Sequence, residues 1–418
     1  MAIDNKDKKV LNVPHLRFPE FTEEWDRCKV SELLDFYSTN SLCWEQLEYE
    51  TNTILNLHYG LIHVGLPTMV DLSKDKLPNI KEGNMPKNFE LCKDGDIAFA
   101  DASEDTNEVA KAVEFYNIDE KDVVCGLHTI HGRDNADRTV IGFKGYAFSS
   151  DAFHHQIRRI AQGTKVFSIS TKNFFECYIG IPSKEEQTKI ATLLRLIDER
   201  IATQNKIIED LKKLKCAIIE KVLNGNNANN LRLGDVGSYI RGLTYSSDDV
   251  VEYNSTLVMR SNNIVNGSLL DYQNNVVSVN KQISQEQQLQ DGDIIICMAN
   301  GSSALVGKSS FYDGKCISPI TVGAFCGIYR SKTAITKWLF QTNRYRRYIW
   351  NSLQGGNGAI ANLNSEDILR MSFPLPDKQT AERCIKLLSS LESLIESNIS
   401  LCSKFFQQKE YLLRQMFI

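Results

Sequence analysis

The sequence predicts an α+β protein with two similar domains of mixed strands and short helices, each followed by one long helix. The prediction comes from a repeat: residues 93–97 (Lys-Asp-Gly-Asp-Ile) return as 290–294 (Gln-Asp-Gly-Asp-Ile), and the step Ile181-Pro182 returns as Leu375-Pro376. The spacing of roughly two hundred residues far exceeds that of a solenoid or propeller repeat. The chain of 418 residues is therefore expected to contain a duplicated domain.

The repeat divides the chain into five segments. They are an N-terminal tail with the first domain (1–183), a central helix (184–224), a linker (225–230), the second domain (231–376) and a C-terminal helix (377–418). Inside each domain the Gly-Asp-Ile segment indicates a turn followed by a strand, at 95–100 and 292–297. Late in each domain we expect a helix with arginine beside histidine or aromatic residues, around Arg158 and around Arg344.

Apolar residues at heptad spacing predict the two long helices. Ser183 and Glu186 predict a capping box at the start of the first helix, and Asn224-Gly225 predict its end. Adding 194 to the numbers of the first seam gives the second, so the two helices are expected to pack against each other. The predicted seam residues are Leu194, Ile197, Ile201, Gln204, Ile208 and Leu211 in the first helix, and Leu388, Leu391, Ile395, Asn398, Cys402 and Phe405 in the second.

The direction of the second helix follows from the likeness of the domains. If both domains join their helices in the same way, the second helix must run back along the first, which predicts an antiparallel coiled-coil spacer with one domain at each end. About forty residues at 1.5 Å each give a spacer of roughly 60 Å. Gln204 and Asn398 would then meet near its middle, where a buried polar pair can fix the register. The alternative is that both are polar residues tolerated on a wide seam.

Composition indicates a folded intracellular protein without a membrane segment. Eleven cysteines occur without a Cys-x-x-Cys pair, which fits reduced core thiols in the cytoplasm better than disulfides or a zinc site. The net charge of −4 argues mildly against a nonspecific nucleic-acid binder, because gripping phosphates requires lysine and arginine. Local clustering of positive charge can override that total.

The sequence lacks recognisable catalytic motifs. Residues 301–309 resemble a phosphate-binding loop, but five residues rather than four separate the two glycines, which argues against nucleotide binding. His128 and His131 have no carboxylate or cysteine at ligand spacing, so a role in the core or on the surface is favoured over metal binding. We therefore expect no catalytic residue, no cofactor and no metal site.

Several segments together resemble the specificity subunit of a type I restriction-modification enzyme. They are Arg17-Phe18-Pro19-Glu20-Phe21 followed by Trp25, the two Gly-Asp-Ile strands, the step from Ile-Pro or Leu-Pro into Glu186-Gln187-Thr188-Lys189-Ile190-Ala191 and Ile197-Asp198, and the duplicated long helix. The resemblance covers nearly the whole chain. It implies two target-recognition domains separated by the helical spacer, and a non-catalytic protein whose cofactor and chemistry belong to partner chains.

The resemblance also implies partners. Each domain would read one half of an asymmetric bipartite site in double-stranded DNA, and the helices would dock two methyltransferase subunits, which in turn carry nuclease-translocase subunits. Because DNA repeats its groove every ~34 Å, a rigid spacer would set the gap between half-sites. The alternative is a duplicated, non-catalytic binding or adaptor protein for a ligand other than DNA.

Candidate DNA-binding residues follow from side-chain chemistry, because arginine and asparagine bridge guanine and adenine edges and lysine contacts phosphates. In the first domain they are Arg133, Asn135, Arg138, Lys165 and Lys172. In the second domain they are Arg241, Arg260, Asn262, Asn263 and Asn300, with Arg344, Arg346 and Arg347 on the late helix, where interleaved tyrosines suit a nucleic-acid surface.

Overall fold

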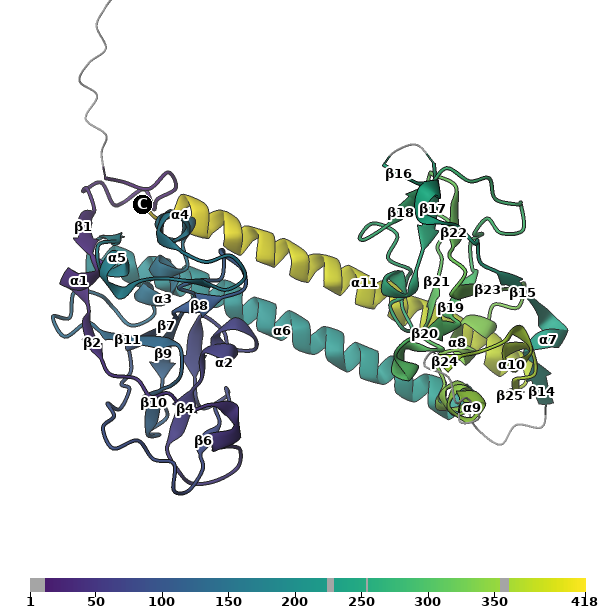
Figure 1. Cartoon of the computed structure of the whole chain (residues 1–418), viewed down its shortest axis with the longest axis horizontal. Helices are drawn as coiled ribbons and strands as arrows, with labels where there is room; N and C mark the ends of the chain where they lie inside the picture. The colour runs from purple at the N-terminus through teal and green to yellow at the C-terminus, as the bar shows by residue number, and fades with distance from the viewer. Residues whose placement is uncertain (1–11, 224–228, 253–254, 354–360) are drawn as a thin grey trace, which may run out of the picture. The chain divides into compact units, whose positions relative to one another are not determined.

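The computed structural model describes residues 12–223, 229–252, 255–353 and 361–418. The chain forms two compact units (Figure 1): residues up to Asn205 together with Ser400–Ile418, and Lys206–Ile399. The two long helices, α6 (Lys184–Leu223) and α11 (Lys378–Gln415), contribute residues to both units. In the described ranges, no helix combines the length and the apolar character that crossing a membrane requires.

The first unit consists of short strands and short helices. Its strands are β1 (Asp26–Lys29), β2 (Asp35–Tyr37), β3 (Leu47–Glu48), β4 (Leu55–Leu57), β5 (Met69–Asp71), β6 (Asn79–Ile80), β7 (Ile97–Ala100), β8 (Ala102–Ser103), β9 (Ala112–Asn117), β10 (Val123–Cys125), β11 (Thr129–Arg133), β12 (Phe167–Ser168) and β13 (Tyr178–Ile181). Its short helices are α1 (Val30–Leu33), α2 (Tyr59–His63), α3 (Phe143–Phe148), α4 (Asp151–Ile160) and α5 (Thr171–Phe175), with a 3₁₀ turn at Trp44–Gln46.

The second unit is built in the same way. Its strands are β14 (Asn229–Arg232), β15 (Gly237–Arg241), β16 (Val250–Val251), β17 (Thr256–Met259), β18 (Val277–Val279), β19 (Ile294–Cys297), β20 (Ala299–Asn300), β21 (Ser309–Phe311), β22 (Ile320–Val322), β23 (Cys326–Ser331), β24 (Ala361–Asn362) and β25 (Ser372–Leu375). Its helices are α7 (Leu233–Val236), α8 (Thr336–Leu339), α9 (Asn343–Leu353) and α10 (Ser365–Leu369), with 3₁₀ turns at Ser247–Asp249, Ser261–Asn263 and Ser303–Leu305.

Sheet by sheet, the second unit repeats the first. The sheet β2-β11-β7-β9-β5 corresponds to β15-β23-β19-β21, and β10-β4-β6-β3 corresponds to β22-β17-β18-β16. The pairs β1-β13 and β12-β8 correspond to β14-β25 and β24-β20. The difference between the larger sheets is β5, which extends the first unit by one strand. This correspondence confirms the α+β class and the duplication.

The repeated Gly-Asp-Ile segment forms the same turn in both units. Gly95 and Gly292 both have φ of 84°, a left-handed conformation that glycine adopts without strain. The following aspartate turns back to accept a backbone N–H three residues earlier, from Lys93 to Asp96 at 2.9 Å and from Gln290 to Asp293 at 2.8 Å. The turn thus aims β7 and β19 into the two cores.

Most of the residues predicted for the seam of the two long helices are buried. In α6, Leu194, Ile197, Ile201 and Ile208 are buried, as are Leu388, Leu391, Ile395 and Cys402 in α11. Leu211, Asn398 and Phe405 are partly exposed, and Gln204 is buried. The predicted meeting of Gln204 with Asn398 stays a prediction.

Within each unit the helix segments run antiparallel. In the first, Asp198 contacts Lys409 at 2.7 Å and Asn205 contacts Cys402 at 3.3 Å, so numbers rise along α6 as they fall along α11. In the second, Lys215 contacts Glu392 at 3.5 Å, and Leu223 shares a core with Cys384.

The start of α6 differs in one respect from the predicted capping box. Ser183 Oγ accepts a hydrogen bond from the Glu186 N–H at 3.3 Å, as expected. The Glu186 carboxylate does not complete the box, because both of its oxygens accept 2.7 Å bonds from the Arg17 guanidinium. The predicted end of the helix, Asn224-Gly225, lies outside the described residues, and β14 begins at Asn229, inside the segment expected to be a linker.

Candidate nucleic-acid interface

In the second unit, several strand ends meet around one open cleft. Strands β17 and β22 are parallel, so the residues after them, from Arg260 and from Gly323, lie at the same sheet edge. The cleft measures about 560 Å³ and we call it the Arg260 cleft. It is lined by Leu243, Tyr245, Ser246, Ser247, Arg260, Ser261, Ala299, Asn300, Gly301, Gly323, Ala324, Phe325 and Cys326.

The chemistry of the Arg260 cleft suits recognition of base edges. The exposed Arg260 side chain donates one bond to the Asn275 carbonyl at 3.2 Å, and Asn300 Nδ2 donates to Ser261 Oγ at 3.3 Å. The Phe325 ring is 66% exposed although it is apolar. A guanidinium, a carboxamide and exposed aromatic carbon in one cleft provide the two polar groups and the apolar surface that read groove edges.

Asn263, a predicted DNA contact, instead shapes the loop that presents Arg260. Its side chain is fully buried, accepts the Arg260 N–H at 2.9 Å and donates to the carbonyls of Asp271 and Asn274. A buried carboxamide with these partners positions its neighbours rather than touching a ligand. Asn262 beside it is exposed, and so is Arg241 at the end of β15.

A second cleft of about 470 Å³ lies along α9, and we call it the Arg346 cleft. Arg346 and Lys308 line it together with Trp350, whose ring is 66% exposed. Gly301 lines the Arg260 cleft and Ser303 lines the Arg346 cleft, so the loop at 301–303 separates the two. Paired cations beside an exposed ring suit phosphates that flank a base-reading site.

The other two arginines of α9 differ in their surroundings. Arg347 is exposed, whereas Arg344 donates from Nε to the Ser372 carbonyl at 3.0 Å and so ties α9 to β25. Of the three predicted arginines on this helix, Arg346 is therefore the one that joins a cleft.

The first unit carries a corresponding face with different side chains. His58 follows β4, which is parallel to β10, and so occupies the place that Arg260 has after β17. His128 occupies the place of Phe325. Adding 197 to the residue numbers of the β7-β11 pairs gives the β19-β23 pairs, and the same addition turns 128 into 325. With Trp44 and Tyr59 these histidines form what we call the His58 face: Trp44 lies 4.4 Å from His58 and Tyr59 lies 5.2 Å from His128, centroid to centroid.

Hydrogen bonds fix the imidazoles of the His58 face. His58 Nδ1 accepts the Gly60 N–H at 3.1 Å, and His128 Nδ1 lies 3.1 Å from an Asp101 carboxylate oxygen. Burial, with a smaller effect from His128, lowers the pKa of His58. Trp44 remains 45% exposed, so this face also offers aromatic surface to a ligand.

Arg133, predicted to contact DNA, is held in the core instead. Its guanidinium donates two 2.8 Å bonds to Asp96 and one of 2.7 Å to Glu90. Burial alone would raise the pKa of Asp96, but hydrogen bonds from His131 and Arg133 hold it below its ordinary value. Arg330 makes the same two-point contact with Asp293 in the second unit, at 2.8 and 2.6 Å. We call this two-point arginine–aspartate contact the Asp–Arg clamp. Because it occurs in both units, we interpret it as structural, and Arg133 is not part of the proposed interface.

The remaining predicted residues of the first domain are spread over its surface. Asn135 donates to Asp35 and to the Tyr37 hydroxyl, and Arg138 pairs with Asp26 at 2.5 Å. Lys165 is exposed just before β12, the partner of β8, and Lys172 is exposed on α5. Because β8 corresponds to β20, which contains Asn300, Lys165 is the one of these nearest in topology to the His58 face.

Side-chain chemistry alone did not select the aromatic and imidazole members of the two faces. Aromatic rings such as Trp44 and Phe325 are often buried in a core, so their exposure is visible only in the fold. Extending the sequence repeat outward from the Gly-Asp-Ile segments would have aligned Phe325 with His128 and marked both.

Comparison with known proteins finds likeness to one family. The type I restriction modification DNA specificity domain matches residues 226–401. The specificity subunit of the type I restriction enzyme EcoKI from Escherichia coli K12 is 29% identical over 171 residues, which cover 38% of this chain and 35% of that subunit. The chain thus spans about a third of the length of the curated relatives it matches.

Solved structures share the fold over almost the whole chain. The S subunit of a type I restriction-modification system from M. genitalium matches with a TM-score of 0.56 at 14% identity, covering 97% of this chain and 99% of that one. A structure from a study of complex assembly and conformational transition of the type I system matches with a TM-score of 0.53, covering 93% of this chain and 96% of that one. At 14% identity these matches establish the fold.

Proposed function

We propose that this chain is a specificity subunit of a type I restriction-modification system, that it reads a bipartite DNA sequence for that system, and that it performs no catalysis itself. Each unit would read one half of the site, the second through the Arg260 cleft and the first through the His58 face. The partners would be double-stranded DNA, two methyltransferase subunits docked on the long helices and, through them, nuclease-translocase subunits. The protein would bind its DNA target in the cytoplasm.

The observation that supports two different half-sites is the contrast between equivalent positions. Where the second unit has Arg260 and Phe325, the first has His58 and His128, on strands with the same pairing. Arginine favours guanine edges, whereas histidine and tryptophan rings offer a polar group and apolar carbon. An asymmetric recognition sequence follows from two scaffolds alike in fold but different in these side chains.

The remaining cationic candidates would hold the DNA backbone. Arg346 in the second unit and Lys165 and Lys172 in the first are exposed, and Lys308 beside Arg346 is partly buried; these cations would contact phosphates. With a net charge of −4, the chain alone would bind DNA weakly, and the partner subunits would supply much of the grip. Arg241, Asn262 and Arg347 are exposed and remain candidates at the margin of the interface.

The test is to express the full chain with the methyltransferase subunits of its system and to map methylated adenines in the host genome. We expect methylation at an asymmetric two-part sequence with a fixed gap, and none without this chain. Methylation independent of the chain would contradict the proposal. Binding of the methyltransferases without DNA retention would instead favour an adaptor for another ligand.

A further inference from the structure

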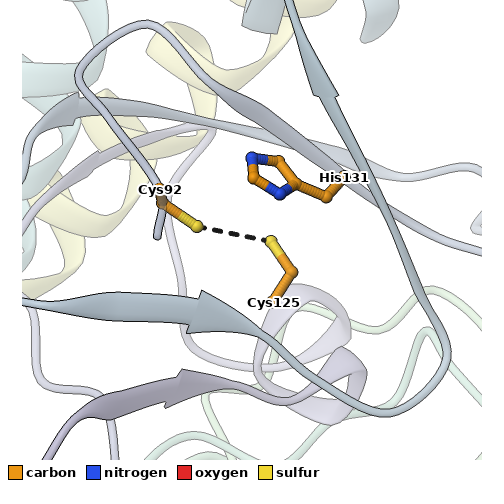
Figure 2. Close-up of side chains that lie close together, drawn as sticks. All are labelled: Cys92, Cys125 and His131. Carbon is orange, nitrogen blue, oxygen red and sulfur yellow. Dashed lines mark hydrogen bonds between the residues drawn. The ribbon is translucent and has the colours of Figure 1, made fainter. Parts of the chain in front are cut away.

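Three metal-ligating side chains meet in the core of the first unit: Cys92, Cys125 and His131 (Figure 2). The two sulfur atoms lie 3.6 Å apart, and all three ligand atoms lie within 4.8 Å of one another. Cys92 precedes the Gly-Asp-Ile turn, Cys125 ends β10 and His131 lies in β11. Cys92 is separated from Cys125 by 33 positions in the sequence, so the fold brings together ligands that do not form one contiguous motif.

The imidazole of His131 is oriented as a metal ligand would be. Its Nε2 lies 2.8 Å from Asp96 Oδ2, whereas its buried Nδ1 has no hydrogen-bond partner among the described residues. Figure 2 shows one ring nitrogen of His131 directed toward the sulfurs. When Nε2–H donates its hydrogen bond to the carboxylate, the neutral ring keeps its lone pair on Nδ1. Metal-binding histidines commonly have such a carboxylate behind them.

The second unit shows that the fold does not require these polar groups. Leu289 donates its N–H to Ile320 as Cys92 does to Val123, and Ile328 pairs with Ile295 as His131 pairs with Ala98. Val322 takes the place of Cys125, because each is the last paired residue of its strand in the parallel pairs β17-β22 and β4-β10. All three replacements are buried in an apolar core. The three equivalent positions therefore hold three aliphatic side chains in the second unit and three potential metal ligands in the first. This all-or-none difference is expected if the three ligands act together as one site.

We propose that Cys92 Sγ, Cys125 Sγ and His131 Nδ1 bind one zinc ion in the first unit. In tetrahedral zinc sites with Zn–S bonds of about 2.3 Å, two thiolates lie ~3.8 Å apart, close to the sulfur separation here. On binding, both thiols release their protons to solvent, and the two thiolates neutralise the dication. A water molecule would complete the four-coordinate shell.

The charge around the site supports a buried cation. With two thiolates and a neutral imidazole, the zinc centre has no net charge, so burial costs far less than for an isolated ion. Behind it the Asp96 carboxylate is balanced by Arg133, its two-point partner. Zinc would also give the unpaired His131 Nδ1 a partner, and it would tie β10 and β11 to the segment before β7.

The experiment measures zinc in the full chain purified without chelators. We expect about one zinc per chain by elemental mass spectrometry, and exchange with cobalt should give the near-ultraviolet charge-transfer band of thiolate ligands. The variant Cys92→Leu/Cys125→Val/His131→Ile, which copies the core of the second unit, should fold and lose the zinc. The matched control, Cys297→Val/Cys326→Val, changes two buried cysteines of the second unit and should keep it.

Three outcomes would overturn the site: metal-free protein after growth in zinc, a Cys92–Cys125 disulfide in non-reducing peptide mapping, or unchanged zinc content in the triple variant. The cobalt spectrum is recorded on the unaltered protein, so the test does not depend on the variant folding. A chelator should lower the melting temperature of the unaltered chain and leave that of the triple variant unchanged. None of these measurements requires DNA or a partner subunit, so the zinc site and the proposed function can fail separately.

Discussion

The Lys409 ammonium lies 2.7 Å from the Asp198 carboxylate, and a shift of 194 turns this pair into Lys215 and Glu392, which also form an ion pair. Both pairs join α6 to α11, one in each unit, and all four side chains are largely buried. The internal duplication therefore extends to individual polar contacts on the helix seam.

Removing one member of this pair should destabilise the first unit. In Lys409→Met, Asp198 keeps its bond from the Tyr146 hydroxyl but loses its cation, and we expect a loss of about 1 kcal/mol in the free energy of unfolding. A denaturant titration measures it. Lys213→Met, which removes an exposed pair with Glu209, is the control and should change stability little. Equal losses in both variants would show that the seam pair has no special role.

The Arg133 clamp should matter for folding rather than for sequence preference. Arg133→Ala leaves the buried Asp96 carboxylate without its two-point guanidinium partner, and breaking such a pair costs about 3–5 kcal/mol. We expect Arg330→Ala to act alike in the second unit, because Asp293 is equally buried. Thermal unfolding measures both. A folded Arg133→Ala protein with altered base preference would restore Arg133 as a DNA contact.

Arg260→Ala should weaken recognition of one half-site. A lost arginine contact to a base edge costs about 1–3 kcal/mol, so methylation at that half-site should fall roughly 5- to 150-fold while preference at the other half stays the same. Methylation of a library of half-site variants by the assembled complex provides the measurement. Arg370→Ala removes an exposed arginine of α10 and serves as the control. If all sequences lose equally, Arg260 contacts phosphate.

Substitution of the exposed aromatic rings should affect the two half-sites separately. Trp44→Ala should relax base preference in the half read by the first unit, and Phe325→Ala should do so in the other half. Both rings are exposed, at 45% and 66%, so neither change should lower the melting temperature by much. The same library assay tests this reciprocity. Loss in both halves from either variant would contradict separate reading.

Lengthening both long helices should change the gap and leave the bases unchanged. Seven residues inserted in each helix near the boundary between the units add about 10 Å at 1.5 Å per residue and preserve the seam. We expect the gap in the methylated sequence to grow by about three base pairs, since DNA rises ~3.4 Å per pair. Mapping methylated adenines gives the new gap. An unchanged gap would show that the helices do not set it.

Features with a sequence period or a repeat could be predicted, and features made by tertiary contact could not. The α6 and α11 seam and the Gly95 and Gly292 turns follow from local rules, so the class and the duplication were foreseeable. Arg133 looked like a DNA contact because nothing in its neighbourhood reveals that Asp96, far back in the chain, will enclose it. Cys92, Cys125 and His131 have no motif spacing for the same reason. Burial and long-range pairing decide both cases.

The Asp–Arg clamp behind each Gly-Asp-Ile turn has a consequence for how such a chain can change over time. Asp96 with Arg133 and Asp293 with Arg330 secure the sheets from the interior, whereas His58, His128, Arg260 and Phe325 lie at strand ends. Substitutions at those ends leave the interior anchors intact. Under the proposed function, changes at these positions would alter the target sequence with little loss of thermodynamic stability.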